Sequence, residues 1–274
     1  MLKLDYSDEN ADSIGKMISI PQKERVTVIT STHNRLESLK ESVNSIMNQT
    51  YQNWEYFIVS DGYDSRVRWF IKSLNEKRIK YLFTLETQYV GYLQRNLALK
   101  FASGKYVFCV DDDNIIYSDY IEKMVNSFVS EDIGYVICQI KYDGIGILYP
   151  QLPFQLNKID MLNYMVRTSL ARRVKGWVPY DYQSDFKLIS KISKISKGNF
   201  LPEVLGWHRT LPERREKTKE AKYFGILPYS SKLILPLLKR ILFKFNIELD
   251  SNKPIKIYIN RLIYKILCKI WLKF

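Results

Sequence analysis

The chain has 274 residues, 46% of them hydrophobic, 14% aromatic and 26% charged, a composition that excludes disordered, collagen-like and disulfide-framed miniature proteins. Its length suits one α/β domain with additions rather than two catalytic domains. The formal net charge is +13, and the segment 231–274, with ten basic and two acidic residues, carries +8 of it.

Strands and helices alternate in the first half of the chain. Runs rich in β-branched and aromatic residues predict four strands, at 26–31, 56–59, 79–83 and 106–110. Apolar residues at helical spacing predict the three helices between them, at 36–47, 65–75 and 92–102. This order indicates right-handed βαβ units. We therefore expect an α/β, Rossmann-like fold with a mainly parallel sheet flanked by helices.

The strict alternation ends after residue 113. In the second half we expect a helix at 119–128, a strand at 135–140 with an antiparallel neighbour after the turn at 143–146, helices at 159–170 and 181–196, and a strand at 199–208. Changes in composition divide the chain into three parts, namely a polar leader at 1–24, a folded body at 25–225 and a tail at 226–274.

An acidic run, Asp111, Asp112 and Asp113, follows directly after the strand predicted at 106–110. The carboxyl ends of parallel strands border the crevice in which open α/β sheets bind ligands. Carboxylates there offer the oxygen ligands that Mg²⁺ and Mn²⁺ prefer, and a metal in such a crevice suits a diphosphate. An acidic turn that caps the following helix would give the same pattern.

Polar side chains also follow the first two predicted strands, at 31–35 and 60–65. If the strands are parallel, these side chains share the sheet edge of the acidic run, where Asp61 can accept the imide N–H of a uracil or thymine base. Arg95 and Asn96 lie near the start of the helix before the acidic strand, so they can face phosphate. Helix caps, a turn and a solvated arginine explain the same residues without any ligand.

Together these elements resemble the donor half of a family 2 glycosyltransferase with the GT-A fold. The resemblance runs through VTVITSTHNR, NQTYQNWEYFIVSDG and GYLQRNLALKFASGKYVFCVDDDN. It implies a donor half at about 25–115 and an acceptor half at about 116–225. The family often has Tyr where His33 stands and Asp where Gly62 stands.

The resemblance also implies roles for individual residues. The nucleotide-sugar donor, a UDP-sugar in most of the family, would contact Ser31, His33, Asp61, Arg95, Asn96 and Asp112. His33 and Asp61 would lie near the base, and Arg95 and Asn96 near the diphosphate. Asp111 and Asp113 would form the DxD pair that meets Mn²⁺ or Mg²⁺.

In the acceptor half, the family carries a carboxylate general base at the start of a helix, often after Glu. Asp185 stands in that position, with Ser184 in place of the Glu, and Asp181 is a rival. Either aspartate can take the proton of an acceptor hydroxyl, and either can instead cap the helix. His208 lies where many relatives have a histidine near the diphosphate, which implies a metal ligand, although a structural histidine beside Trp207 fits equally.

The tail pairs basic and apolar residues. In 255–274, basic residues recur at every fourth position from Arg261 and leave a wide apolar face, as in helices that lie on anionic membranes. Packing of two terminal helices on the body or on a partner subunit is the alternative, so a homo-oligomer is left open. No stretch reaches 18 uncharged apolar residues, which disfavours a spanning helix.

These features predict a metal-dependent, inverting glycosyltransferase that acts on a glycan or lipid-linked acceptor in cell-surface polysaccharide synthesis. A sugar nucleotidyltransferase is disfavoured because STHNRLES lacks the glycines that hold a triphosphate. Nucleic-acid binding is disfavoured because the charge surplus lies on an apolar tail. A relative that binds sugar nucleotides without turnover is left open. Scattered cysteines and the absence of an apolar leader predict a cytoplasmic protein on the inner face of the cell membrane.

Overall fold

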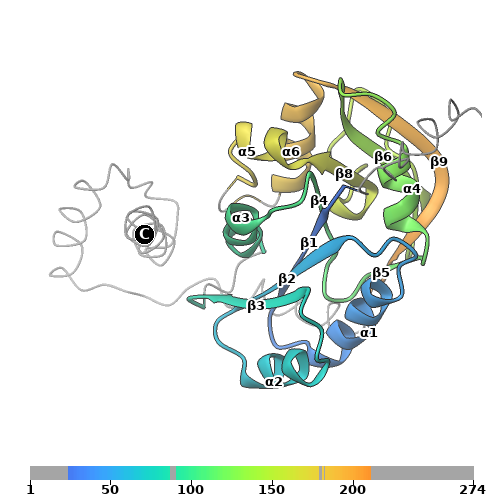
Figure 1. Cartoon of the computed structure of the whole chain (residues 1–274). Coiled ribbons are helices and arrows are strands. Elements are labelled where there is room, and N and C mark those ends of the chain that lie inside the picture. Colours follow the sequence, from blue (N-terminus) through green and yellow to red (C-terminus); the bar gives the residue numbers. More distant parts are fainter. Residues whose placement is uncertain (1–23, 87–90, 179–180, 182, 211–274) are drawn as a thin grey trace, which may run out of the picture.

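A computed structural model describes residues 24–86, 91–178, 181 and 183–210. These residues form one nine-stranded sheet with the strand order β3-β2-β1-β4-β8-β6-β9-β5, and β7 pairs with β6 outside this path. Helices cover both faces of the sheet (Figure 1). The α/β, Rossmann-like fold expected from the sequence is therefore confirmed.

The first half of the chain follows the predicted alternation closely. Its elements are β1 (Val26–Thr32), α1 (Leu36–Met47), β2 (Trp54–Asp61), α2 (Ser65–Ser73), β3 (Ile79–Thr84), α3 (Tyr92–Phe101) and β4 (Tyr106–Cys109). The strand pairs β1–β2, β2–β3 and β1–β4 are all parallel. β1 and β2 are buried almost throughout, as strands covered on both faces must be, so they contain continuous apolar runs.

The second half is a mixed sheet. Its elements are β5 (Ile115–Ile116), α4 (Tyr120–Asn126), β6 (Ile133–Tyr142), β7 (Gly146–Leu148), η1 (Met161–Asn163), β8 (Tyr164–Arg167), α5 (Thr168–Arg173), α6 (Ser184–Ser193) and β9 (Lys197–His208). The predicted hairpin appears as β6 and β7. β8 is antiparallel to both β4 and β6, whereas β9 is parallel to β6. The sheet is thus less dominated by parallel pairs than we expected.

The helix predicted at 159–170 is wrong. The chain instead forms η1, then β8, then the short helix α5. All four residues of β8 are buried between its two neighbouring strands. An apolar segment that is buried on every side has no polar face, so its pattern does not distinguish a helix from a strand.

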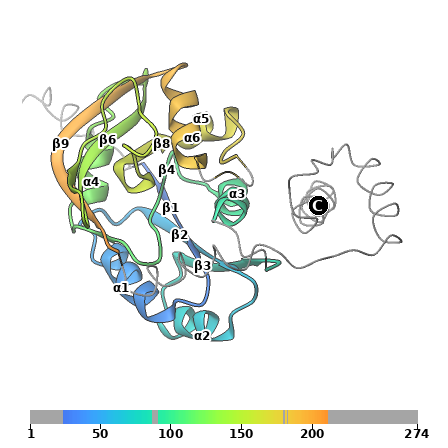
Figure 2. The ribbon, with the colours of Figure 1, turned by 180° about the vertical axis from the view of Figure 1, so that it is seen from behind.

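Two hydrophobic cores lie on opposite faces of the sheet. One joins the buried sides of α1, α2 and α4 to alternate strand residues such as Val28, and the other does the same for α3, α5 and α6 with residues such as Ile29. Figures 1 and 2 show the two helical layers from opposite sides. This sandwich holds the carboxyl ends of β1, β2 and β4 at one common edge.

The polar leader at 1–24 lies outside the described residues except for Glu24, and the tail predicted at 226–274 lies wholly outside them. Among the residues that are described, none belongs to a helix long and apolar enough to cross a membrane.

Candidate active site

The polar residues singled out in the sequence gather at one edge of the sheet. β1 ends at Thr32 and β2 at Asp61, and the acidic run begins two residues after β4. Because these strands are parallel neighbours, their carboxyl ends lie side by side. Tertiary structure also brings the start of α6 to this edge, which places residues of the second half of the chain beside residues of the first half.

A buried arginine joins the two halves. Arg95 of α3 contacts Asp111 Oδ1 at 3.0 Å through one guanidinium nitrogen and Asp185 Oδ1 at 3.5 Å through the other. Its side chain is 4% exposed. Burial opposes the charge of Arg95, but the carboxylates of Asp185 and Asp111 more than offset it and raise the pKa of the guanidinium. Arg95 therefore stays charged and fixes the distance between the acidic run and α6.

Asp185 has the environment of a proton acceptor. Burial raises the pKa of Asp185 to about 6; Arg95 opposes this shift, whereas Asp160 and Asp111 add to it. Its side chain still keeps 26% of its surface exposed, so a ligand can reach the carboxylate. A carboxylate whose pKa lies near neutrality can accept a proton and release it again, as a general base must.

The contacts of Asp181, the other candidate for the base, are those of a residue that stabilises the local structure. Asp181 accepts a hydrogen bond from the backbone N–H of Gln183 at 2.8 Å and forms an ion pair with Lys187 of α6. Although burial raises the pKa of Asp181, the hydrogen bonds from Lys187 and Gln183 outweigh it and lower the pKa overall. Asp181 is therefore ionised and engaged with Gln183 and Lys187 at the start of α6, which favours Asp185 as the base.

Within the acidic run, the carboxylates of Asp112 and Asp113 are tied to β1 and the residues after it. Asp112 accepts hydrogen bonds from Thr32 Oγ1 at 2.8 Å and from Arg35 at 3.0 Å. Arg35 also contacts Asp113 at 3.3 Å, and the Asp113 side chain is completely buried. From the far end of the fold, Arg209 Nε donates to the Asp113 carbonyl at 2.6 Å.

The carboxylates of the acidic run provide some, but not all, of the ligands that a hard divalent cation needs. Asp111 and Asp113 supply carboxylate oxygens, the ligands that Mg²⁺ and Mn²⁺ prefer. Within 24–86, 91–178, 181 and 183–210, no group of three or more His, Cys, Asp or Glu side chains is arranged to hold a metal ion. That Asp111 and Asp113 hold a metal ion together with the diphosphate of a donor stays a prediction.

His208 lies at the end of β9 and is 5% exposed. Its ring stacks on Tyr142 with centroids 4.0 Å apart, and its Nε2 lies 3.7 Å from Oδ2 of Asp160. Its Nδ1 is buried and makes no hydrogen bond. The predicted metal-binding role of His208 stays a prediction; in this structure its ring nitrogen faces Asp160.

The residues predicted to meet the base form a small network at the ends of β1 and β2. Nδ1 of His33 lies 3.0 Å from the backbone carbonyl of Asp61, and Gln94 Nε2 donates to the Asp61 carboxylate at 3.0 Å. Ser31 is close to the start of α3, since a Cβ on Gly91 would lie 2.2 Å from Ser31 Oγ. These side chains are brought together as expected, and their roles toward a base stay predictions.

Three site residues escaped the sequence-based prediction. Arg35 lies in the motif STHNR, whose pattern does not predict its contacts with Asp112 and Asp113. Asp160 was placed inside a helix; its only signal is the Asp-x-x-Asn pattern of the capping box that starts η1. Trp177 gave no signal, because its contact with Asp185 depends on the tertiary fold.

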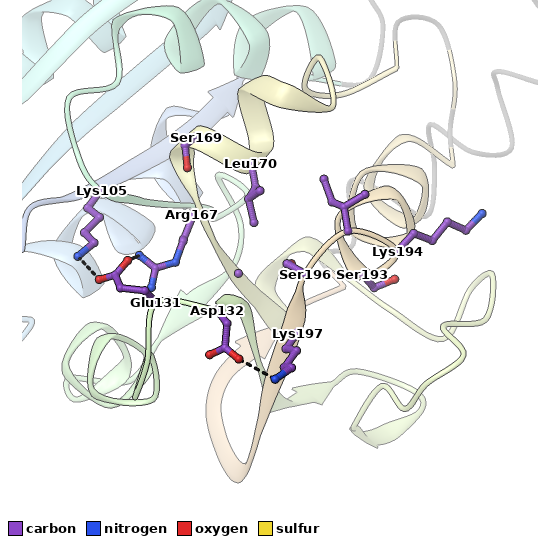
Figure 3. A pocket seen from close by; sticks show the side chains of 12 residues that line it. Lys105, Glu131, Asp132, Arg167, Ser169, Leu170, Ser193, Lys194, Ser196 and Lys197 are labelled. Carbon is purple, nitrogen blue, oxygen red and sulfur yellow. Dashed lines mark hydrogen bonds and ion pairs between the residues drawn. The ribbon is translucent and has the colours of Figure 1, made fainter.

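A surface hollow of about 820 Å³ lies at the amino end of β4, opposite to the end that the acidic run follows. Figure 3 shows the side chains that line it. Lys105, just before β4, and Lys197, at the start of β9, are among its lining residues. Lys105 is paired with Glu131 and Lys197 with Asp132. The lining contains four basic and two acidic side chains, so it keeps a positive excess after these two pairs.

Comparison with known protein families identifies the chain as a glycosyltransferase. Residues 27–193 match the model of Glycosyl transferase family 2, and the chain belongs to that family. The resemblance read from the sequence is therefore confirmed, together with the class of enzyme.

Two relatives illustrate the range of similarity. An uncharacterized glycosyltransferase of Haemophilus influenzae is 32% identical over 245 residues, which span 76% of this chain and 75% of that protein. The UDP-Glc:alpha-D-GlcNAc-diphosphoundecaprenol beta-1,3-glucosyltransferase WfgD of Escherichia coli is 29% identical over 111 residues, 40% of this chain. That match spans 44% of the WfgD length, less than half of it.

Solved structures show the same fold at low identity. S. aureus TarS 1-349 in complex with UDP has a TM-score of 0.60 and 18% identity, with 70% of this chain and 62% of that one covered. The mannosyltransferase PcManGT of Pyrobaculum calidifontis, in complex with GDP-Man and Mn²⁺, has a TM-score of 0.57 and 17% identity, with coverages of 88% and 70%.

Proposed function

We propose that this glycosyltransferase is metal-dependent and inverting, and that it moves a sugar from a UDP-sugar to a glycan or lipid-linked acceptor in cell-surface polysaccharide synthesis. The observation that carries the proposal is the contact of Arg95 with both Asp111 and Asp185. It joins the carboxylate edge of the donor half to an accessible carboxylate of the acceptor half whose pKa is raised to about 6.

The relatives support the choice of donor and acceptor. WfgD is named for a UDP-Glc donor and a diphosphoundecaprenol-linked acceptor, and TarS was solved with UDP. Mn²⁺ accompanies the donor in PcManGT. Asp111 and Asp113 would hold such an ion here, and when bound it would neutralise the charge of the leaving diphosphate.

The chain's own residues then divide the remaining work. The acceptor hydroxyl oxygen attacks the anomeric carbon while Asp185 takes its proton, and the bond from that carbon to the diphosphate oxygen breaks. A single displacement of this kind inverts the anomeric configuration. Arg95 holds the Asp185 carboxylate at the edge of the sheet and keeps a positive charge beside Asp111.

Replacement of the base tests the proposal. With a panel of radiolabelled UDP-sugars and a bacterial lipid extract as the acceptor source, Asp185→Asn should lower the rate of transfer by about 10² to 10⁴ while donor affinity barely changes. Asp181→Asn is the matched control, four residues earlier at the same helix start, and should retain transfer. Full activity in both variants would refute a carboxylate base on this helix; loss in Asp181→Asn alone would move the role to Asp181.

We further propose that residues 226–274 bind the inner face of the cell membrane. The support is the amphipathic pattern of basic and apolar residues in the sequence. Such binding would bring the enzyme to a lipid-linked acceptor.

A further inference from the structure

The carboxylate of Asp185 has a second partner besides Arg95. The indole Nε1–H of Trp177 donates a hydrogen bond to Asp185 Oδ1 at 2.8 Å. Trp177 is 1% exposed, so its ring is held by packing on all sides. The hydrogen bond therefore has a fixed direction, since the indole cannot turn without disrupting the core.

The backbone of Trp177 is clamped by a residue of the donor half. Asn96 Nδ2 donates to the Trp177 carbonyl at 2.7 Å, and the Trp177 N–H donates to Asn96 Oδ1 at 2.9 Å. The side-chain amide of Asn96 thus donates one hydrogen bond to Trp177 and accepts another from it, although the two residues are 81 positions apart in the chain. Asn96 was predicted to lie near the diphosphate, but its amide serves this clamp.

Gly176 makes the clamp sterically feasible. Its φ is +65°, a left-handed conformation that favours glycine. A Cβ at this position would lie 2.2 Å from Asn96 Oδ1, well inside a van der Waals contact. Any side chain at 176 would therefore push the Asn96 amide away from Trp177.

Both restraints on Asp185 come from one turn of α3. Arg95 contacts Asp185 directly, and its neighbour Asn96 acts through Trp177. Both contacts reach Oδ1 of the carboxylate. Oδ2 is then the oxygen that can accept a proton.

We propose that Trp177, held by Asn96 against Gly176, is a positioning residue that orients Asp185 so that Oδ2 faces the acceptor hydroxyl. The inference rests on the proposed role of Asp185 as the base. In the step itself, the hydroxyl proton passes to Oδ2, the freed electron pair forms the new bond to the anomeric carbon, and the nucleoside diphosphate leaves with the electrons of the broken bond.

Other groups also act on Asp185, and a test must separate them from the indole. The charged groups that face it are Arg95 of α3, Asp111 after β4 and Asp160 before η1. The neutral thiol of Cys109 and the phenol of Tyr164 lie on β4 and β8 beside it. Trp177→Phe removes one N–H donor and leaves all five of these groups in place.

The first experiment needs no acceptor. In full-length protein labelled with ¹⁵N-tryptophan, the Nε1–H resonance of Trp177, assigned by its loss in Trp177→Phe, should shift with pH around a midpoint of about 6, the pKa of Asp185. The titration should vanish in Asp185→Asn. A Trp177 resonance that does not respond to pH in the parent protein overturns the inference.

The second experiment measures transfer as a function of pH. Trp177→Phe should lower kcat by about 10- to 100-fold, the range seen when a hydrogen-bonded partner that orients a metal ligand is removed. The KM for the donor should stay within about twofold. The lower limb of the kcat profile should move up by about one pH unit, because a hydrogen bond that stabilised the charged carboxylate is gone.

A double-variant cycle distinguishes positioning from general damage. If Trp177 acts through Asp185, adding Trp177→Phe to Asp185→Asn should cost no further activity. Asn96→Ala should move the pH profile in the same direction as Trp177→Phe. It tests the same role if Trp177→Phe does not fold.

Trp54→Phe is the matched control, because Trp54 is 2% exposed and its Nε1 makes no hydrogen bond. It should leave the pH profile unchanged. If Asp185→Asn abolishes transfer while both Trp177→Phe and Asn96→Ala keep the parent profile, the positioning role is refuted and the proposed function stands. If Asp185→Asn retains full transfer, the proposed function itself fails.

Discussion

Replacing the candidate base should stabilise the protein while it abolishes transfer. In the folded state the pKa of Asp185 is raised to about 6, chiefly by burial, against about 3.9 for an aspartate in an unfolded chain. At neutral pH the folded protein therefore carries an ionised carboxylate that its surroundings disfavour. Asp185→Asn removes this charge and keeps an oxygen that can accept the Trp177 hydrogen bond.

The magnitude follows from the shift. A group whose folded pKa lies above its unfolded pKa contributes stability that is fully present below about pH 4 and is lost as the pH rises through about 6. A difference of about two units corresponds to about 3 kcal/mol in the free energy of unfolding. Because a quarter of the side chain is exposed, this is an upper value. We expect Asp185→Asn to gain about 1–3 kcal/mol relative to the parent between pH 4 and pH 7.

Urea unfolding of both proteins at a series of pH values measures this directly. EDTA should be present, so that no cation at the acidic run alters the field on Asp185. The control Asp181→Asn should behave in the opposite way, because the pKa of Asp181 is lowered. That ionised carboxylate stabilises the fold above about pH 4 and ceases to do so as the pH falls through its folded pKa.

A constant difference between Asp185→Asn and the parent across pH 4 to 7 would refute the reasoning. It would mean that Asp185 titrates alike in the folded and unfolded states, and hence that burial does not perturb it. The proposal that Asp185 is tuned as a base near neutrality would then lose its physical support.

Three further predictions concern the metal, the ion pair and the tail. Asp113→Ala should abolish the Mn²⁺-dependent rise in melting temperature that UDP causes while the fold stays intact; an unchanged rise would contradict the metal site. Arg95→Met should lower the free energy of unfolding by about 3–5 kcal/mol at pH 7, since Asp111 and Asp185 lose their shared cation; urea unfolding that matches the parent would contradict this. Cutting the chain after Tyr229 should end sedimentation with anionic vesicles and retain UDP binding, because about ten basic residues, each contributing on the order of 1 kcal/mol at such a surface, are removed; a shortened protein that still sediments would place the membrane contact elsewhere.

The sequence by itself determined the first half of the fold. β1, β2 and β4 are buried on both faces and therefore contain apolar runs, and helical spacing marks α1, which spans the predicted residues 36–47. The same pattern predicts the position of the acidic run close behind β4. Local periodicity was sufficient to predict these elements because strands and helices alternate there in repeated βαβ units.

Only the tertiary structure decided the second half and the contacts of the candidate base. β8 lies between β4 and β6, and a segment buried in this way has no polar face to reveal its period. Asp181 and Asp185 stand four residues apart at the predicted start of one helix, so the sequence pattern favours neither. The difference between them comes from Arg95 and from Trp177, which reach Asp185 through contacts between residues far apart in the chain. Such contacts depend on how the helices and strands pack against one another, and the local periodicity of the sequence does not specify them.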